Sequence, residues 1–276
     1  TPSALFERHP DLPLLNDQKT SWYDTKAMLV WDVADDRAMD LYWKLTETHI
    51  REYGGGTPRF FHTIGLAERL YGATDDENLQ LKLYTLRRTQ AWVRRHYPDT
   101  PLIIAGWDLM MWWKRADVAG LCDELDPGKT IIFDYNADQN LPPTYRAAGL
   151  YGRFPWLFGM LHCFAFNNEM RGDYALLGGR LAEAAADPKC LGFLLWPELS
   201  HTDTFLLEFL CEKSWRPGRP DADELTGDFC ARRYPAAVRP RWRDVWRRAL
   251  RLIRFTQWGG GEWPVSGFDL EFHHRL

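Results

Sequence analysis

The sequence lacks the features that would place it in several common functional classes. No apolar run reaches the roughly 20 residues that a membrane-spanning helix needs. The triple glycine Gly54–Gly56 ends a helical pattern and precedes a strand pattern, which is the wrong order for a phosphate-binding loop. There is also no Gly-x-Ser-x-Gly elbow for a serine hydrolase. These absences disfavour membrane proteins, nucleotide-binding enzymes and serine hydrolases.

Metal ligands and basic patches are also poorly represented. His62, His162 and His201 fall near predicted strand ends together with Asp108 and Asp134, but no His-x-His or His-x-x-x-His spacing connects them. A metal hydrolase is therefore the less favoured alternative, and we expect no metal or other cofactor. The net charge of -4 and the absence of a nucleic-acid-binding motif argue against nucleic acid as a partner. No membrane partner is expected, and the sequence does not indicate the oligomeric state or the compartment.

The cysteines do not indicate a disulfide framework. Their number is odd, and three of them lie inside apolar runs, which is typical of buried, reduced thiols. The five are Cys122, Cys163, Cys190, Cys211 and Cys230.

Apolar runs that end in polar or aromatic residues alternate with helical patterns along most of the chain. This alternation predicts right-handed βαβ crossovers and a parallel sheet. Five units are clear, with a weaker sixth candidate at Ala27–Trp31. The five are Arg59–Gly65, Leu102–Asp108, Thr130–Tyr135, Trp156–His162 and Cys190–His201. The sequence therefore predicts an α/β fold of the TIM-barrel type.

Helical patterns separate and follow these strands. The first begins after Asp35 or Asp36, and a second is capped by Asp75 or Asp76 and closes at Tyr97. Further helices are expected at about 116–125, 173–186, 202–211, 224–234 and 241–256. The Pro- and Gly-rich stretch 216–223 indicates a linker or domain boundary. We therefore expect a barrel domain over residues 1–215 and the start of an α-helical domain over 216–276.

The number of units is too small for a complete barrel. A (β/α)8 barrel has eight strands, whereas this sequence offers five or six before the helical tail. We therefore expect a partial barrel, an incomplete copy of a longer fold. Because exposed sheet edges pair with other chains, such a piece is expected to be unstable or oligomeric alone.

Tryptophan is unusually common, with 14 residues, and its positions suggest two roles. Trp92, Trp242 and Trp246 lie on apolar helix faces and are assigned to packing. Trp107, Trp156 and Trp196 lie at strand ends or beside turns, where an aromatic ring can stack on a sugar. Carboxylates and aromatics at the carboxyl ends of parallel strands suit carbohydrate chemistry.

The carboxylate of Glu198 follows the most complete strand pattern. Trp196-Pro197-Glu198 ends the apolar run that begins at Cys190, which is how a buried parallel strand delivers an acid to the mouth of a barrel. Alternatively, Glu198 caps the helix that begins near Thr202, since acidic residues favour helix N-termini.

Several of these segments resemble the α-N-acetylglucosaminidases, glycoside hydrolase family 89. The segment 152–168 is similar to that family's Pro-aromatic-Ile-Trp-Cys-Met-Leu-His-Asn-Phe-Gly-Gly-Asn stretch. In the same order, 104–107 resembles Leu-Gln-Gly-Trp, 133–135 resembles Leu-Asp-Leu and 196–198 resembles Ala-Pro-Glu-Gly. The segment 229–234, followed by Trp246, resembles the start of the family's helical domain. The resemblance extends from about Trp22 to Thr256.

The resemblance implies hydrolysis of terminal α-linked N-acetylglucosamine, or a related α-glycoside, with retention of configuration by two glutamates. Glu198 takes the position of the nucleophile. The family's acid/base is the Glu of Phe-Asn-Glu, but this chain has Phe61-His62-Thr63 there, and Thr63 cannot protonate a leaving group. Candidates for the second acid are Glu68, Asp108 and Glu169, with Glu68 ranked first.

The resulting hypothesis is a glycoside hydrolase with a carbohydrate substrate. Its catalytic candidates are Glu198, Glu68 and Asp108. Residues predicted to bind the substrate are His62, Trp107, Asp134, Tyr135, Trp156, His162, Asn167 and Trp196. The alternative is a catalytically inactive carbohydrate-binding homologue, which the missing Phe-Asn-Glu acid makes credible.

Overall fold

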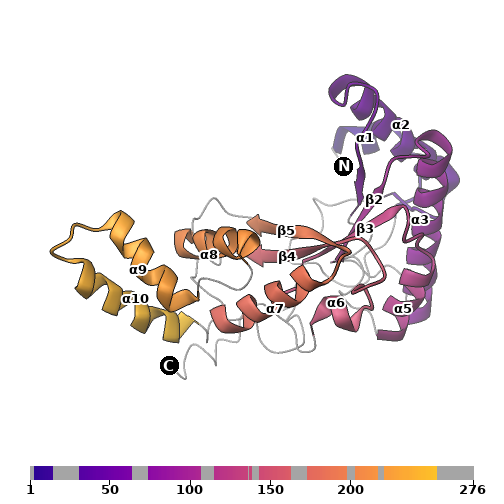
Figure 1. Ribbon diagram of the computed structural model, residues 1–276. Helices are drawn as coiled ribbons and strands as arrows, with labels where there is room; N and C mark the ends of the chain where they lie inside the picture. Colours follow the sequence, from indigo (N-terminus) through magenta and orange to yellow (C-terminus); the bar gives the residue numbers. More distant parts are fainter. Residues whose placement is uncertain are drawn as a thin grey trace. The chain divides into compact units, whose positions relative to one another are not determined.

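A computed structural model of the chain shows helices alternating with strands (Figure 1). It describes residues 3–14, 31–63, 74–106, 115–135, 137–138, 143–162, 173–197, 203–216 and 221–253. The strands are β1 (Phe61–Thr63), β2 (Leu102–Ala105), β3 (Thr130–Asp134), β4 (Trp156–His162) and β5 (Cys190–Pro197). The helices before β4 are α1 (Ser3–Arg8), α2 (Asp36–Tyr53), α3 (Asp75–His96), α5 (Arg115–Asp123) and α6 (Thr144–Ala147). Those after β4 are α7 (Tyr174–Ala186), α8 (Thr204–Trp215), α9 (Ala222–Arg233) and α10 (Arg239–Ile253).

The strands form a five-stranded sheet in the order β1-β2-β3-β4-β5. Pairing is parallel between β1 and β2, between β3 and β4 and between β4 and β5. Sequential order with parallel pairing means that each strand returns to the same end of the sheet through a crossover. The α/β fold predicted from the alternating pattern is confirmed.

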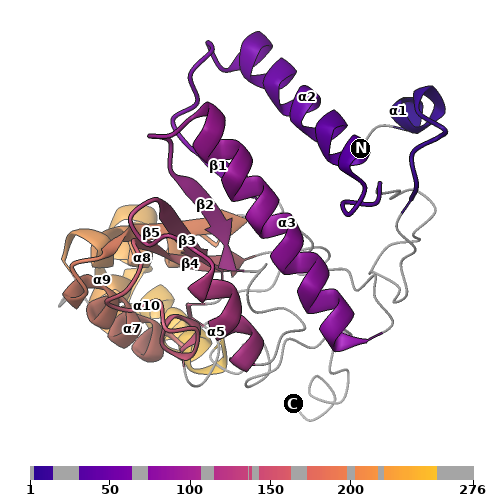
Figure 2. The ribbon, with the colours of Figure 1, turned by 90° about the vertical axis from the view of Figure 1, so that its right-hand side faces the viewer.

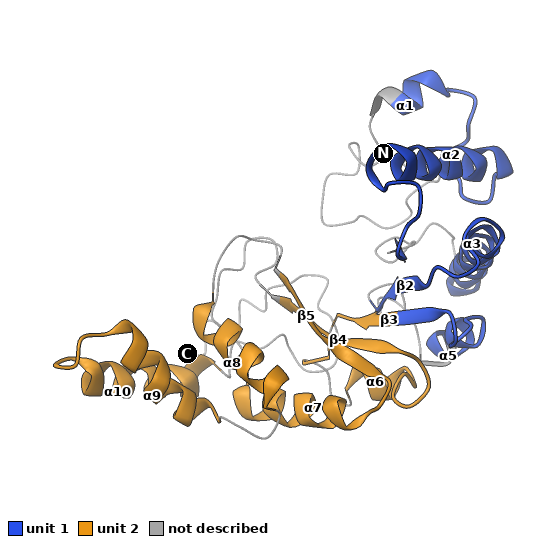
Figure 3. Cartoon of the chain, turned by 45° about the horizontal axis from the view of Figure 1, so that its top comes forward, with its two compact units in different colours: residues 1–131 blue, residues 132–276 orange. Residues whose placement is uncertain are grey.

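The chain divides into two compact units, residues 1–131 and 132–276 (Figure 3). In the first unit, α2 and α3 lie side by side (Figure 2), with Trp43 stacked on Trp92 at 4.8 Å between ring centroids. Arg88 on α3 pairs with Asp36 at the start of α2. Trp92 therefore packs between helices, in agreement with its position on an apolar helix face. The predicted boundary between residues 215 and 216 stays a prediction.

Helix caps follow the sequence signals closely, with one correction. Asp35 caps α2, accepting from the backbone N–H groups of Arg37 and Ala38. The cap of α3 is Thr74, not Asp75 or Asp76 as predicted. Its hydroxyl accepts from the N–H of Glu77, whose carboxylate in turn accepts from the N–H of Thr74. This reciprocal capping box satisfies two donors, which a single aspartate in the first turn does not.

The longest strands, β4 and β5, pair with each other in the second unit. Their pairing runs from Trp156 opposite Cys190 to His162 opposite Pro197, with one bulge near the start. At that bulge Gly192 adopts φ +142°, a conformation that favours glycine. The weak sixth strand candidate lies mostly outside the described residues; Trp31 at its end makes an isolated antiparallel bridge with Leu14.

Helices α7 to α10 are joined to one another by aromatic packing. Tyr174 at the start of α7 lies against Phe205 and Phe209 of α8, with centroids 5.3 and 4.9 Å away. Phe205 also stacks on Trp246 of α10 at 5.2 Å, and Trp246 contacts Phe229 of α9 at 4.9 Å. Trp246 therefore packs as predicted, and the helical segment 221–253 is anchored on α8 through this cluster.

Gly159 in β4 is required by a close approach of β3. A Cβ atom there would lie 2.2 Å from the backbone oxygen of Asp134 and 2.2 Å from the Phe133 ring. We expect Gly159→Ala to lower the free energy of unfolding by about 3 kcal/mol, because backbone and a buried ring must both shift. In Gly179→Ala, the control, the added methyl meets no atom within 4 Å. That change should be neutral or stabilise helix α7 by about 0.5–1 kcal/mol. Equal stability of the two variants in urea unfolding would contradict the argument.

Candidate active site

The carboxyl ends of β4 and β5 bring several predicted residues to one edge of the sheet. Leu161 lies opposite Trp196, and His162 lies opposite Pro197, the last residue of β5. Glu198 is the next residue along the chain and lies outside the described residues, so its predicted place at this edge stays a prediction. The backbone of His162 ends β4, while its side chain is not among those described.

An aromatic corner occupies the same edge. The ring centroids of Tyr135, just after β3, and Trp196, near the end of β5, are 5.7 Å apart. Phe133 lies 6.0 Å from Trp196 and 4.2 Å from Tyr135. Tyr135 is buried, whereas 37% of Trp196 is exposed. Trp196 therefore keeps part of its ring exposed while it packs against two buried rings.

Asp134 lies at the end of β3 but is completely buried. Its two carboxylate oxygens are 2.6 and 2.5 Å from the hydroxyl of Thr144, which donates to the carboxylate. Thr144 begins the short helix α6, and nothing in the sequence distinguished it. The contact shows how the fold accommodates a buried carboxylate, and it places Asp134 beneath the surface of the edge.

Trp156 is placed differently from the other predicted binding residues. It is the first residue of β4, at the opposite end from His162, and none of it is exposed. Its ring stacks on Tyr145 at 4.8 Å, and its indole N–H donates to Asp187 at 2.9 Å. Burial opposes ionisation of Asp187, but N–H groups of Lys189, Gly152 and Trp156 donate to its carboxylate and hold its pKa below the usual value. Trp156 therefore lies in the core, at the opposite end of β4 from the edge where the site is expected.

His62 belongs to the first unit, where it is the middle residue of β1. The ring is exposed, yet partial desolvation by its surroundings lowers the pKa below the usual value for histidine. A neutral imidazole is thus favoured, which can both donate and accept hydrogen bonds.

The predicted residues Glu68, Trp107, Asp108 and Asn167 lie outside the described residues, as does the alternative acid Glu169.

The alternative role of Glu198 as a helix cap is filled by another residue. Helix α8 begins at Thr204, and the carboxylate of Asp203 accepts from the backbone N–H of Leu206. Asp203 is the N-cap, so the fold does not need Glu198 for that purpose.

Two further properties concern the described residues alone. None of their helices is both long and apolar enough to cross a lipid bilayer. Among the same residues, no three His, Cys, Asp or Glu side chains gather in a way that could hold a metal ion.

Three solved structures of a bacterial enzyme are similar to this chain. The chain resembles the family 89 glycoside hydrolase from Clostridium perfringens in complex with PUGNAc, with a TM-score of 0.67 and 16% identity, covering 95% of this chain and 29% of that chain. It also resembles that enzyme with two glutamates changed to glutamine, bound to its substrate GlcNAc-α-1,4-galactose (TM-score 0.64, 16% identity, 88% and 26% covered). A third structure holds 2-acetamido-1,2-dideoxynojirimycin (TM-score 0.63, 16% identity, 88% and 27% covered). At this identity the likeness shows the fold, and the chain spans less than a third of the enzyme's length.

One of the two sequence comparisons found a relative of this chain, the family model. No curated protein matches the chain. The family model described as the tim-barrel domain of alpha-N-acetylglucosaminidase matches residues 1–217, well over half of the sequence. The five-stranded parallel sheet is part of that barrel, and the protein belongs to the α-N-acetylglucosaminidase family of glycoside hydrolases.

Proposed function

We propose that this protein hydrolyses terminal α-linked N-acetylglucosamine, or a closely related α-glycoside, with retention of configuration. The observation that supports this most is the parallel β4–β5 edge within a family 89 barrel, where β5 ends at Pro197 directly before Glu198. Barrel enzymes carry their catalytic residues at the carboxyl ends of the strands. The similar bacterial enzyme, which binds GlcNAc-α-1,4-galactose as its substrate, supports the choice of sugar.

The proposed reaction uses two carboxyl groups in two steps. Glu198 attacks the anomeric carbon while the second acid gives its proton to the departing glycosidic oxygen, which forms a covalent glycosyl-enzyme. The second group then takes a proton from water, which attacks the same carbon and releases Glu198. A separation of about 5–5.5 Å between the carboxyl groups suits this mechanism. We assign the second role to Glu68 or Asp108.

The aromatic corner has a supporting role in this proposal. Trp196 is two residues before Glu198 and is partly exposed at the sheet edge, 5.7 Å from the Tyr135 ring. A ring at this place can stack against the apolar face of the sugar bound at Glu198. Tyr135 and Phe133 are buried and pack against this ring, which restricts its movement.

One observation favours a second candidate function, carbohydrate binding without catalysis. Where the family has a glutamate, β1 ends in Thr63, a residue that cannot act as a proton donor at neutral pH. Without another acid in reach, an α-glycoside with a poor leaving group would be bound and not cleaved.

Hydrolysis of an aryl α-N-acetylglucosaminide separates these candidates. We expect release of the phenol, and proton NMR of the first product should show the α-anomer. If the sugar binds without turnover, the protein is a carbohydrate-binding protein without catalytic activity. First appearance of the β-anomer would contradict retention, and the absence of both binding and turnover would overturn both functions.

A further inference from the structure

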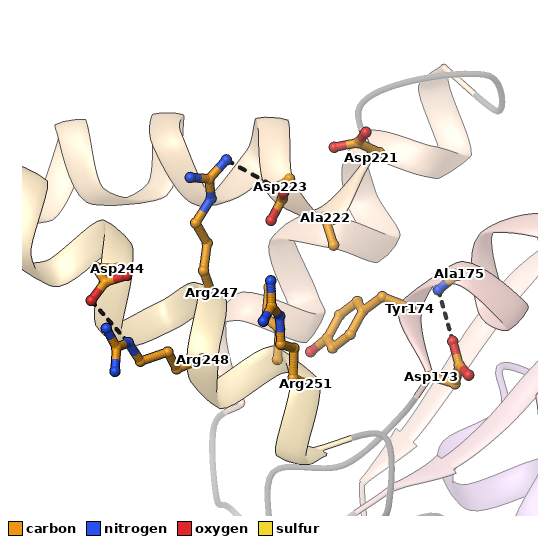
Figure 4. A pocket seen from close by; sticks show the side chains of 11 residues that line it. Asp173, Tyr174, Ala175, Asp221, Ala222, Asp223, Asp244, Arg247, Arg248 and Arg251 are labelled. Atoms are coloured by element: carbon orange, nitrogen blue, oxygen red, sulfur yellow. Dashed lines mark hydrogen bonds and ion pairs between the residues drawn. The ribbon is translucent and has the colours of Figure 1, made fainter.

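A pocket of about 740 Å³ lies between helices α7, α9 and α10 of the second unit (Figure 4). This volume is in the range of small-molecule sites. None of the residues predicted to bind the sugar or to catalyse its hydrolysis lines it. Most of its lining side chains are charged, and both signs are present: Asp173, Asp221, Asp223, Asp244, Arg247, Arg248 and Arg251. The uncharged Tyr174 also lines it.

Tyr174 gives this pocket a buried donor. The residue is 6% exposed, and its hydroxyl has no hydrogen-bond partner among the described residues. Its ring is fixed by edge-on contacts with Phe205 and Phe209 of α8. Figure 4 shows the hydroxyl end directed toward Arg251 of α10. Burial, with the nearby Asp203 carboxylate, raises the pKa well above the usual value, so the group stays a hydrogen-bond donor.

Most of the other charges in the pocket are already engaged. Asp173 and Asp221 cap α7 and α9 by accepting from backbone N–H groups. In α10, Arg247 pairs with Asp223 at 3.4 Å, and Arg248 pairs with Asp244 at 2.9 Å. Arg251, one turn further along, makes no hydrogen bond or ion pair with any residue that the structure describes.

We propose that this pocket binds a small hydroxylated carboxylate, whose anionic group is held by Arg251 and the Tyr174 hydroxyl. A guanidinium matches a planar carboxylate through two parallel N–H donors, and the phenol adds a third. The surrounding aspartates retain acceptor positions for hydroxyl groups of the ligand. The four aspartates that line the pocket repel a dianion such as hydrogen phosphate more strongly than a monoanion, which favours the carboxylate.

A bound carboxylate would also satisfy the buried hydroxyl of Tyr174, which otherwise has no hydrogen-bond partner among the described residues. A buried hydroxyl without a partner lowers the stability of the fold, whereas one that donates to a bound carboxylate does not. The site concerns α7 and the helical segment, so it stands independently of the hydrolase reaction proposed above.

Titration calorimetry of the 276-residue chain with gluconate tests the site. Glucitol, which has the same hydroxyl pattern without the carboxylate, and inorganic phosphate are the comparison ligands. We expect gluconate to bind at one site and glucitol to bind at least about tenfold more weakly. Equal binding of gluconate and glucitol, stronger binding of phosphate, or no binding of gluconate would each overturn the proposal.

Two variants and a matched control locate the binding. Arg251→Gln should weaken gluconate binding roughly tenfold or more, and Tyr174→Phe about fivefold. Arg241→Gln, an exposed arginine of the same helix outside the pocket, should change nothing. Without ligand, Tyr174→Phe should keep or raise the melting temperature, because it removes an unpartnered buried hydroxyl. A clearly lower melting temperature, or unchanged gluconate binding in both pocket variants, would contradict the assignment.

Discussion

Glu198→Gln should reduce the turnover of an aryl α-N-acetylglucosaminide by about four orders of magnitude or more while the thermal unfolding transition stays in place. The change keeps the shape of the side chain and removes only the negative charge that attacks the anomeric carbon. Helix α8 should be unaffected, because its N-cap is Asp203. Initial rates with purified variants, corrected for the folded fraction, measure the effect.

The matched control for this variant is Glu47→Gln. Glu47 is an exposed residue of α2, and no interaction of its side chain is present among the described residues. Its loss of charge should leave the rate within about twofold, since isolated surface changes have small effects.

A nucleophile can also be replaced from solution. In Glu198→Ala, added azide should restore part of the activity and yield the β-glycosyl azide, because azide attacks the face that the carboxylate had occupied. Substantial activity in Glu198→Gln would remove the residue from the nucleophile's role.

Strands β4 and β5 could be predicted from the sequence because each is an almost uninterrupted apolar run. The run Cys190–Pro197 contains no polar side chain after its first residue, and Trp156–His162 contains none before its last, so both bounds are visible in the sequence. The cap of α3 was misplaced because three candidate caps, Thr74, Asp75 and Asp76, follow one another. Only the reciprocal hydrogen bonds with Glu77 decide among them.

The site could be predicted less completely, since exposure depends on contacts distant in sequence. Trp156 and Trp196 look alike as strand-terminal tryptophans, yet one begins its strand and the other precedes the end of its strand. The indole of Trp156 is turned to Asp187, 31 residues away, which no local pattern signals. The buried partnership of Asp134 with Thr144 is likewise formed across a loop. No local pattern places the arginines of α10 beside Tyr174, because their shared pocket forms only where α7 and α10 meet.

The second carboxylate is the remaining element of the proposed reaction, and its identity predicts a large, diagnostic loss of activity. Glu68 is the first candidate. An alternative, non-catalytic role for Glu68 is an ion pair with Arg69 or Arg88. Of these two arginines, Arg88 already binds Asp36 and the hydroxyl of Tyr84. We expect Glu68→Gln to slow hydrolysis of an unactivated α-N-acetylglucosaminide by about 10²–10⁴-fold, the usual contribution of general acid catalysis.

The dependence on leaving group distinguishes an acid from a residue that merely supports the fold. A 2,4-dinitrophenyl leaving group departs without a proton, so Glu68→Gln should form the glycosyl-enzyme from that substrate nearly as fast as the unaltered protein. The basic limb of the pH–rate profile for the unactivated substrate should disappear, because the group that loses its proton there is gone. Asp108→Asn and Glu169→Gln serve as parallel variants of the same chemistry. If the leaving-group dependence appears in Asp108→Asn instead, the acid is Asp108. If none of the three variants shows it, the two-carboxylate mechanism fails and the sugar-binding function is preferred.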